Sequence, residues 1–280
     1  MAEQEAPEQF TRLGTHTWFW QGDLERHEQT NVGVVVDGDA LVVVDANFGW
    51  AAERIIAGLS ATFGRPISHV ANTHYHVDHS LGNETFVRAG ATVVGAAGQR
   101  AELLAKGPAD ADVQIGRQPE SFSPPTLEFV GTMTFPRSGL ELQSLPPAHT
   151  GSDLIAWIPA DAVLFVGDLA VDWDHGNNFS DDAVDIDGWL QALERCLAYA
   201  PRIVVPAHGR VGGPEVLRRQ HAFIDALWTA AKESAALGRA QIDAPSLRTI
   251  LTEHAALAVD EPTLAEMADS MVQAARRLGR

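Results

Sequence analysis

One short stretch of the sequence gathers side chains that bind transition metals. The run Asn72-Thr73-His74-Tyr75-His76-Val77-Asp78-His79-Ser80 holds three histidines and one aspartate within six positions. Imidazole nitrogens and a carboxylate together suit zinc, iron or manganese. A fully extended strand would point alternate residues to opposite faces, so these ligands can converge only if the chain turns here. The spacing therefore predicts a metal-binding loop rather than scattered surface histidines.

Three further candidate ligands, His149, Asp168 and His208, stand at the ends of apolar runs. Folds of the α/β class commonly place active sites at the ends of buried strands. Seven nitrogen and oxygen ligands are too many for one tetrahedral ion, and they fit two ions that share a bridging carboxylate. The only thiol, Cys196, falls within a predicted helix and is interpreted as a core residue, so a closed thiolate site is not expected. The ligand set indicates hydrolytic chemistry.

Alternating strands and helices must position these residues. In the first half, a hairpin turn at Asp37-Gly38-Asp39 joins two β-branched runs, and helical spacing begins at Trp50 and stops at Gly64 and Pro66. Residues 99–123 are expected to connect two halves, with a helix at 101–106 and loops from Gly107-Pro108 and at 118–125. The remaining elements predicted for this half are strands at 17–21, 31–36, 41–44, 67–71 and 92–94 and a short helix at 83–89.

The second half repeats part of this pattern. The segment Gly38–Asp45 resembles Ala160–Asp168, and each precedes a helix and an apolar strand that ends in histidine. Two such units predict two packed sheets with helices outside. A helix at 188–200 should be capped by Asp187, and the chain from Pro214 should be helical with breaks near Gly238 and Asp260. Strands are expected near 126–130, 133–135, 140–145, 154–158, 163–166 and 203–205.

Composition narrows the class of partner. The chain has 280 residues, of which 45% are hydrophobic, and its 37 acidic and 20 basic residues give a net charge of −17. A surface this acidic repels phosphate backbones and anionic lipid heads, so we expect a small-molecule substrate and no nucleic-acid or membrane partner. The polar start of the chain, the lack of a membrane-spanning apolar window and the single cysteine predict a cytoplasmic location. The oligomeric state stays open.

The ligand residues resemble those of the metallo-β-lactamase-fold hydrolase superfamily. The run His74-Tyr75-His76-Val77-Asp78-His79 matches the hallmark His-X-His-X-Asp-His. His149 before Thr-Gly-Ser-Asp, Asp168 after Phe-Val-Gly, and His208 in Pro-Ala-His-Gly are similar to the remaining motifs in the right order. The resemblance spans roughly residues 17–212.

This resemblance implies an α/β fold, namely an αββα four-layer sandwich of two mixed β-sheets with helices on both outer faces. The sandwich would occupy residues 11–213. The C-terminal helical extension at 214–280, which the resemblance does not cover, is expected to pack on the same domain. Two zinc ions are implied, with iron or manganese as other possibilities. One ion would be held by His74, His76 and His149, and the other by Asp78, His79 and His208, with Asp168 bridging.

The implied reaction is attack of a metal-activated hydroxide on a carbonyl. Asp78 would be the catalytic residue that orients the hydroxide and relays its proton, and Asp45 would support the metal loop. An aspartate at position 168 resembles the glyoxalase II and lactonase-like branches and predicts an ester, lactone or thioester substrate. The candidate substrate contacts are Trp20, Phe48, Trp173, His175 and Asn178.

Other functions stay open at this point. A β-lactam substrate is disfavoured because the best-studied β-lactamases of the superfamily have cysteine where this chain has Asp168. An iron-dependent oxidoreductase is a second alternative, although diiron relatives usually replace one early histidine that this chain keeps. A non-catalytic binding protein is disfavoured by the complete ligand set, and a phosphodiester or sulfate ester would be the next substrate class to test.

Overall fold

The computed structural model describes residues 10–257 and 259–278, in two compact units. Of the described residues, 10–145 and 152–165 form the first unit, and 146–151 and 166–278 without 258 form the second. The four predicted ligands of the 74–79 loop belong to the first unit, and His149, Asp168 and His208 belong to the second. The domain division at 213/214 stays a prediction.

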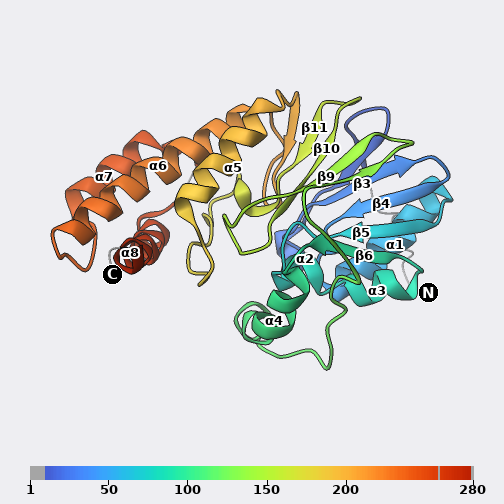
Figure 1. Cartoon of the computed structure of the whole chain (residues 1–280), viewed down its shortest axis with the longest axis horizontal. Coiled ribbons are helices and arrows are strands. Elements are labelled where there is room, and N and C mark those ends of the chain that lie inside the picture. The colour runs from blue at the N-terminus through green and yellow to red at the C-terminus, as the bar shows by residue number, and fades with distance from the viewer. Residues whose placement is uncertain (1–9, 258, 279–280) are drawn as a thin grey trace. The chain divides into compact units, whose positions relative to one another are not determined.

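The first unit contains a mixed seven-stranded sheet (Figure 1). Its order is β1-β2-β3-β4-β5-β6-β7, antiparallel from β1 to β4 and parallel from β4 to β7. The predicted turn between β3 and β4 is present, with Gly38 at φ 65°. The strands are β1 (Thr11–Arg12), β2 (Thr17–Trp20), β3 (Val32–Asp37), β4 (Ala40–Val44), β5 (Ile67–Ala71), β6 (Thr92–Ala96) and β7 (Leu127–Phe129).

A second sheet in this unit has the antiparallel order β11-β10-β9-β8. These strands are β8 (Thr132–Phe135), β9 (Leu140–Ser144), β10 (Leu154–Ile158) and β11 (Val163–Phe165). The two sheets pack on each other where β3 has no side chain: a Cβ on Gly33 would lie 2.6 Å from the ring of Phe165. His69 of β5 likewise meets the ring of Phe135 edge-on at 5.0 Å.

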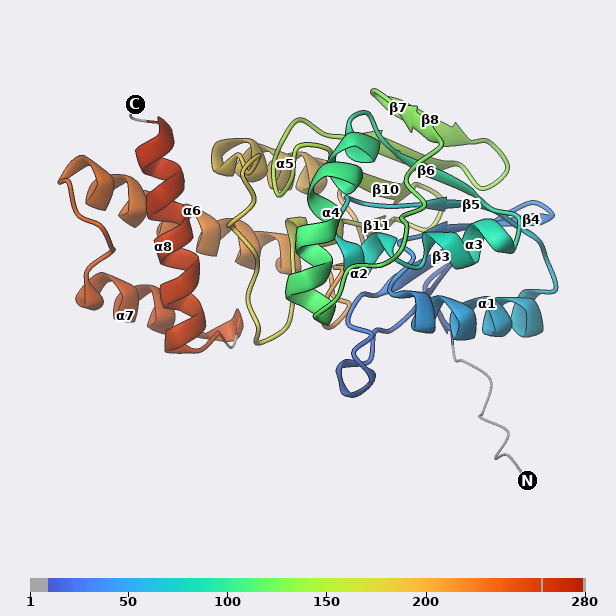
Figure 2. The same ribbon diagram turned by 90° about the horizontal axis from the view of Figure 1, so that it is seen from below.

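Helices cover the other face of the seven-stranded sheet (Figure 2). Those that pack in the core of this sheet are α1 (Gly49–Phe63) and α3 (Asn83–Arg88). The first unit also contains α2 (Val77–Ser80), α4 (Gln99–Ile115) and the single turn η1 (Leu24–Arg26). The face of α1 that carries Ile55 and Leu59 packs on Val43 and Val70, all fully buried. Burial of such side chains stabilises each by roughly 1.5–3 kcal/mol. Gly64 ends α1 as predicted, in the left-handed conformation.

The predicted loop at Gly107-Pro108 is wrong, because α4 runs through both residues. Pro108 has no amide hydrogen to donate to the carbonyl of Leu104, but Leu104 is 50% exposed, so water can donate a hydrogen bond to that carbonyl instead. Gly107 is buried against Leu103 and the ring of Phe122, which a Cβ added there would approach to 2.9 and 3.2 Å. Tertiary packing therefore holds a helix that local propensity argues against.

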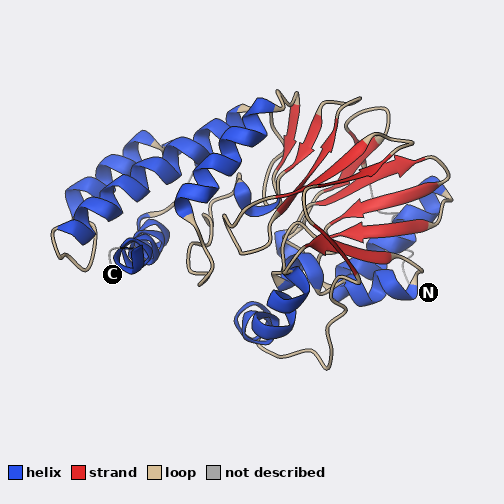
Figure 3. Ribbon diagram, viewed as in Figure 1, coloured by secondary structure: helices blue, strands red, loops and turns tan. Residues whose placement is uncertain are grey.

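The second unit is mostly helical (Figure 3). Helix α5 is capped by Asp185, whose carboxylate accepts from the amide of Gly188 at 2.9 Å, so the predicted cap at Asp187 is wrong. Asp187 lies in the first turn and accepts from Nε1 of Trp228 at 2.8 Å instead. The elements are η2 (Gly167–Leu169), α5 (Ile186–Ala198), β12 (Ile203–Val205), α6 (Glu215–Ala236), α7 (Ala244–Glu253), η3 (Ala255–Leu257) and α8 (Glu261–Leu278).

The predicted α/β class with two β-sheets is confirmed, and so are the helical tail and its breaks. Strand β7, expected to begin the second half, instead closes the first sheet beside β6. Among the residues described, no helix is both long and apolar enough to cross a membrane. Cys196 is fully buried in α5, and burial raises the pKa of its thiol to about 12, which makes it an unreactive core residue as expected.

Candidate metal centre

The predicted metal-binding loop follows β5 directly, and the chain turns there. The side-chain amide of Asn72 donates to the carbonyl of His79 at 2.8 Å and to Asn83 Oδ1 at 3.0 Å, which ties the two ends of the loop together. After His76 the chain enters the single-turn helix α2, which carries Asp78 and His79. Strand end, turn and helix thus avoid the alternation that would separate the ligands.

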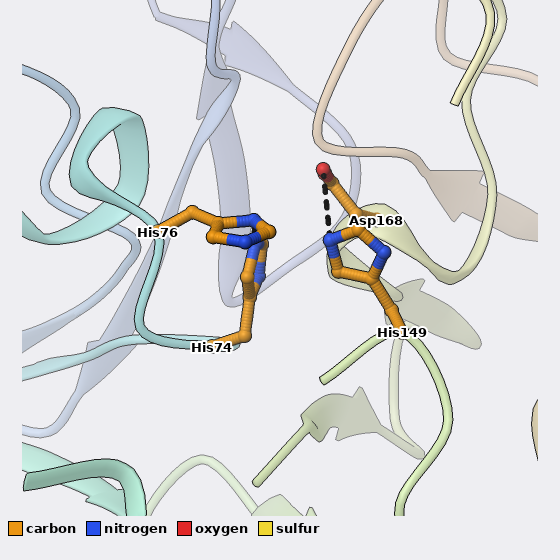
Figure 4. A group of neighbouring side chains, drawn as sticks. All are labelled: His74, His76, His149 and Asp168. Carbon is orange, nitrogen blue, oxygen red and sulfur yellow. Dashed lines mark hydrogen bonds and ion pairs between the residues drawn. The ribbon is translucent and has the colours of Figure 1, made fainter. Parts of the chain in front are cut away.

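The first unit presents a buried group of three imidazoles and one carboxylate. Nε2 of His74 lies 2.9 Å from Nδ1 of His76, and the two rings stand nearly edge to face (Figure 4). Nε2 of His79 lies 3.4 Å from a carboxylate oxygen of Asp78. In each of these pairs the candidate ligand atoms are within 4.8 Å of one another. The four residues are at most 6% exposed.

Asp45 and Thr73 orient the rings of this group. The Asp45 carboxylate accepts from the amide of Thr73 at 2.7 Å and lies 3.1 Å from Nδ1 of His79. The Thr73 hydroxyl reaches Nδ1 of His74 at 3.2 Å. Because both rings are held through Nδ1, their Nε2 atoms are the ones that would bind an ion, and a carboxylate behind a ligating histidine is the usual arrangement.

Two residues that the sequence analysis missed hold Asp78. Gln114 of α4 donates from Nε2 to Asp78 Oδ1 at 3.0 Å, and the Thr30 hydroxyl donates to Asp78 Oδ2 at 3.0 Å. Helix α4 is also joined to the loop by Asp110, which accepts from the amide of Val77 at 2.8 Å. No motif signals such partners, because they come from segments far from Asp78 in the sequence.

The second unit presents a group built on Asp168. One carboxylate oxygen of Asp168 lies 3.6 Å from Nε2 of His149, as drawn in Figure 4, and the other lies 3.3 Å from Nε2 of His208. Asp168 sits in η2, His208 follows β12, and His149 follows β9. All three are at most 8% exposed. A buried carboxylate between two imidazoles is costly unless its charge is balanced, which a cation would do.

Two tryptophans of the second unit contact its histidines. The indole of Trp173 stacks on the ring of His208 at 4.2 Å and 10°, and Trp189 meets His149 edge-on at 5.0 Å. Nε1 of Trp189 donates to the carbonyl of Leu169 at 2.9 Å, next to Asp168. These ring contacts restrict the orientations of both histidines.

The predicted substrate contacts lie in different environments. In the first unit, Trp20 is buried among Val32 and Val34 of the core, and Phe48 is buried with its ring stacked on Trp50 at 4.6 Å. In the second unit, Trp173 is half-buried, whereas His175 and Asn178 are exposed. His175 pairs with Asp174 at 2.7 Å. All five stay predictions.

The donors of both units fit a transition metal. Five imidazoles and two carboxylates are buried, without a thiolate, in the nitrogen and oxygen mixture that zinc, iron and manganese accept. In the first unit, the Asp45 carboxylate and the Thr73 hydroxyl lie behind the rings of His79 and His74, as partners of metal-binding histidines usually do.

Comparison with known proteins gives a family match and structural neighbours. The family model for the metallo-beta-lactamase superfamily matches residues 26–208. A metallo-beta-lactamase type 2 of Bacteroides fragilis is 29% identical over 107 residues, which are 36% of this chain and 42% of that protein. The chain therefore matches less than half the length of that relative.

Solved structures share the fold. The metallo-beta-lactamase FIM-1 from Pseudomonas aeruginosa, in its mono-zinc form, superposes with a TM-score of 0.65 at 19% identity, over 79% of this chain and 96% of that one. A metallo-beta-lactamase from Hirschia baltica gives a TM-score of 0.63 at 21% identity, over 78% and 98%. At these identities the likeness concerns the fold alone.

Proposed function

Because the chain belongs to the metallo-beta-lactamase superfamily, we propose that its two buried ligand groups together form one dinuclear metal centre of a hydrolase. The substrate is a small molecule with an ester, lactone, thioester or related carbonyl group. The family match at 26–208 includes all seven candidate ligands, from His74 to His208, which supports a joint role for them.

The observation that carries this proposal is the way Asp168 presents its carboxylate. Its two oxygens pair with two different histidines, His149 and His208. A carboxylate that would bridge two ions can offer one oxygen to each, beside a histidine ligand of that ion. We assign His74, His76 and His149 to one ion and Asp78, His79 and His208 to the other, with Asp168 shared. Zinc is the metal we expect, because one ion would have three imidazole ligands and the other two, with carboxylates completing each set, and this mixture suits zinc.

When bound, such a pair of ions supplies a hydroxide near neutral pH and polarises the substrate carbonyl. The remaining work belongs to the protein. Gln114 and Thr30 each donate to one oxygen of Asp78, so this carboxylate keeps one orientation and can accept a proton in a fixed direction. Burial of the ligand residues excludes bulk water from both groups.

Position 168 favours the ester, lactone and thioester branches over β-lactamases, since this chain has aspartate where the best-studied β-lactamases have cysteine. A β-lactam substrate is the second candidate, and the observation that favours it is the 29% identity with the Bacteroides fragilis metallo-beta-lactamase. An iron centre with redox chemistry is the third and is distinguished by metal analysis.

The test begins with metal analysis of the purified protein, followed by assays of ester, lactone, thioester and β-lactam substrates. We expect about two zinc ions per chain and hydrolysis of one carbonyl class, lost in His74→Ala. His221→Ala is the matched control, because His221 lies on α6 and its Nε2 pairs with the exposed Glu194 at 3.6 Å, outside the ligand groups. The proposal would be contradicted if the native metal were iron, or if the zinc-bound protein hydrolysed none of the four substrate classes.

A further inference from the structure

We propose that the C-terminal helix α8 positions the loop formed by residues 171–178 and, through it, the Asp168–His208 ligand group. The proposal rests on the function given above, in which that group holds metal. Helices α6 and α8 both lie beyond residue 208, where the family match ends, so the family resemblance assigns them no role.

Helix α8 contacts the 171–178 loop through Met267. The thioether sulfur of Met267 accepts from the amide of Asn177 at 3.5 Å, and Met267 is only 5% exposed. Gly176 sits on the same side chain: a Cβ built there would lie 2.9 Å from the sulfur and 3.2 Å from the methyl carbon of Thr263. Gly176 also has φ of 70°, a conformation that favours glycine, and an added Cβ would crowd Met267.

The loop in turn contacts two candidate metal ligands. The side-chain amide of Asn177 donates to the carbonyl of Asp168 at 2.6 Å, and Asn177 is 8% exposed. Nε1 of Trp173 donates to the carbonyl of Gly176 at 2.5 Å, which holds the indole parallel to the ring of His208. The residues that touch α8 are thus the same residues that fix Asp168 and Trp173.

Helix α6 anchors the beginning of the loop. The buried side chain of Gln220 accepts from the amide of Val171 at 3.4 Å. Arg219 donates to the carboxylate of Asp172 at 3.0 Å, and Arg210, two residues after His208, donates to its other oxygen at 3.0 Å. Helix α6 thus holds the beginning of the 171–178 loop and α8 holds its end, so the helical extension supports the whole loop.

The experiment compares Met267→Ala with Met271→Ala. Both methionines are buried on α8, one turn apart, so both truncations weaken the helix packing. Hydrogen exchange is first measured on metal-free protein, where the readout does not depend on activity. We expect faster exchange at residues 168–177 in Met267→Ala but not in Met271→Ala. Zinc affinity, measured by competition with a chelator, should fall about tenfold in Met267→Ala only.

Two further variants keep the test decisive if an alanine variant fails to fold. Met267→Leu preserves the volume and should retain most of the metal affinity, whereas Gly176→Ala should loosen the loop while the buried face of α8 is unchanged. Equal exchange of the loop in Met267→Ala and Met271→Ala would overturn the proposal. If the wild-type protein binds no metal, the proposed function fails, while the exchange data on metal-free protein still decide the role of α8.

Discussion

The Asp45 carboxylate lies 3.1 Å from Nδ1 of His79, on the side of the ring opposite the Asp78 carboxylate, which faces Nε2 at 3.4 Å. Asp45 reaches this position with φ at 65°, a conformation that costs free energy for a residue other than glycine. A strained backbone that persists in order to aim a buried carboxylate at a histidine is consistent with a role in holding that histidine for metal.

Replacement of Asp45 tests this relationship. Asp45→Asn keeps the shape but removes the negative charge behind His79, so we expect zinc affinity to fall by roughly 10–100-fold. Competition with a chelator measures the change. Asp39→Asn, in the turn before β4 where the aspartate is fully exposed, serves as the control. Equal affinities in the two variants would show that Asp45 is not needed for metal binding.

Gln114 provides a second test, at the carboxylate assigned as catalytic. Gln114→Ala removes the donor to Asp78 Oδ1, and Gln114→Glu places a negative charge beside it. We expect roughly tenfold lower turnover in the alanine variant and a larger loss in the glutamate variant. Steady-state kinetics at fixed metal occupancy measure both, with the exposed Gln118→Ala as control. Wild-type turnover in Gln114→Glu would exclude this positioning role.

The fold was predictable where local patterns are strong. Runs such as Leu41–Val44 and Val163–Val166 combine β-branched composition with burial, and the structure has strands there. The errors arose where tertiary contacts, rather than local sequence, determine whether a helix continues and where it begins. Pro108 disfavours a helix locally, but packing keeps α4 intact around it. Asp187 stands directly before the residues with helical spacing and therefore looks like the N-cap in the sequence, whereas Asp185 is the residue with the extended backbone that an N-cap needs.

The candidate site was predictable in its ligands but not in their support. His74, His76, Asp78 and His79 stand in one motif, so their types and spacing are visible in the sequence. Gln114 contacts Asp78 across 36 positions of the sequence, and Met267 contacts Asn177 across 90. No periodicity or composition marks such pairs, because only the folded chain brings them together.

Asp161 makes stability depend on pH. Burial alone would raise the pKa of its carboxyl, but hydrogen bonds from the Thr17 hydroxyl and the amides of His16 and Thr15, at 2.6–2.8 Å, hold the pKa below its ordinary value of 3.8. A lowered folded-state pKa stabilises the protein above the unfolded pKa, and this contribution is lost as pH falls through the folded value.

We therefore expect Asp161→Asn to lower the free energy of unfolding by about 1–3 kcal/mol at pH 7, because it replaces a carboxylate that accepts three hydrogen bonds. The difference from wild type should shrink as the pH falls below about 4, where Asp161 of the unfolded chain becomes protonated first, and should shrink further as the pH passes through the lower folded-state pKa. Urea unfolding at several pH values measures it. A difference that stays constant from pH 7 to pH 3 would contradict the pKa direction.

We expect hydrolysis to depend on metal held by both ligand groups. One variant in each group is the most direct test of this dependence. His76→Ala and His208→Ala are assayed beside wild type for zinc per chain and for turnover of the substrate found in the panel. We predict that both variants lose bound zinc and that turnover falls by at least about a hundredfold, since each ion is needed to activate water and polarise the carbonyl. Wild-type turnover in either variant, with its loss of zinc verified, would contradict a joint dinuclear centre.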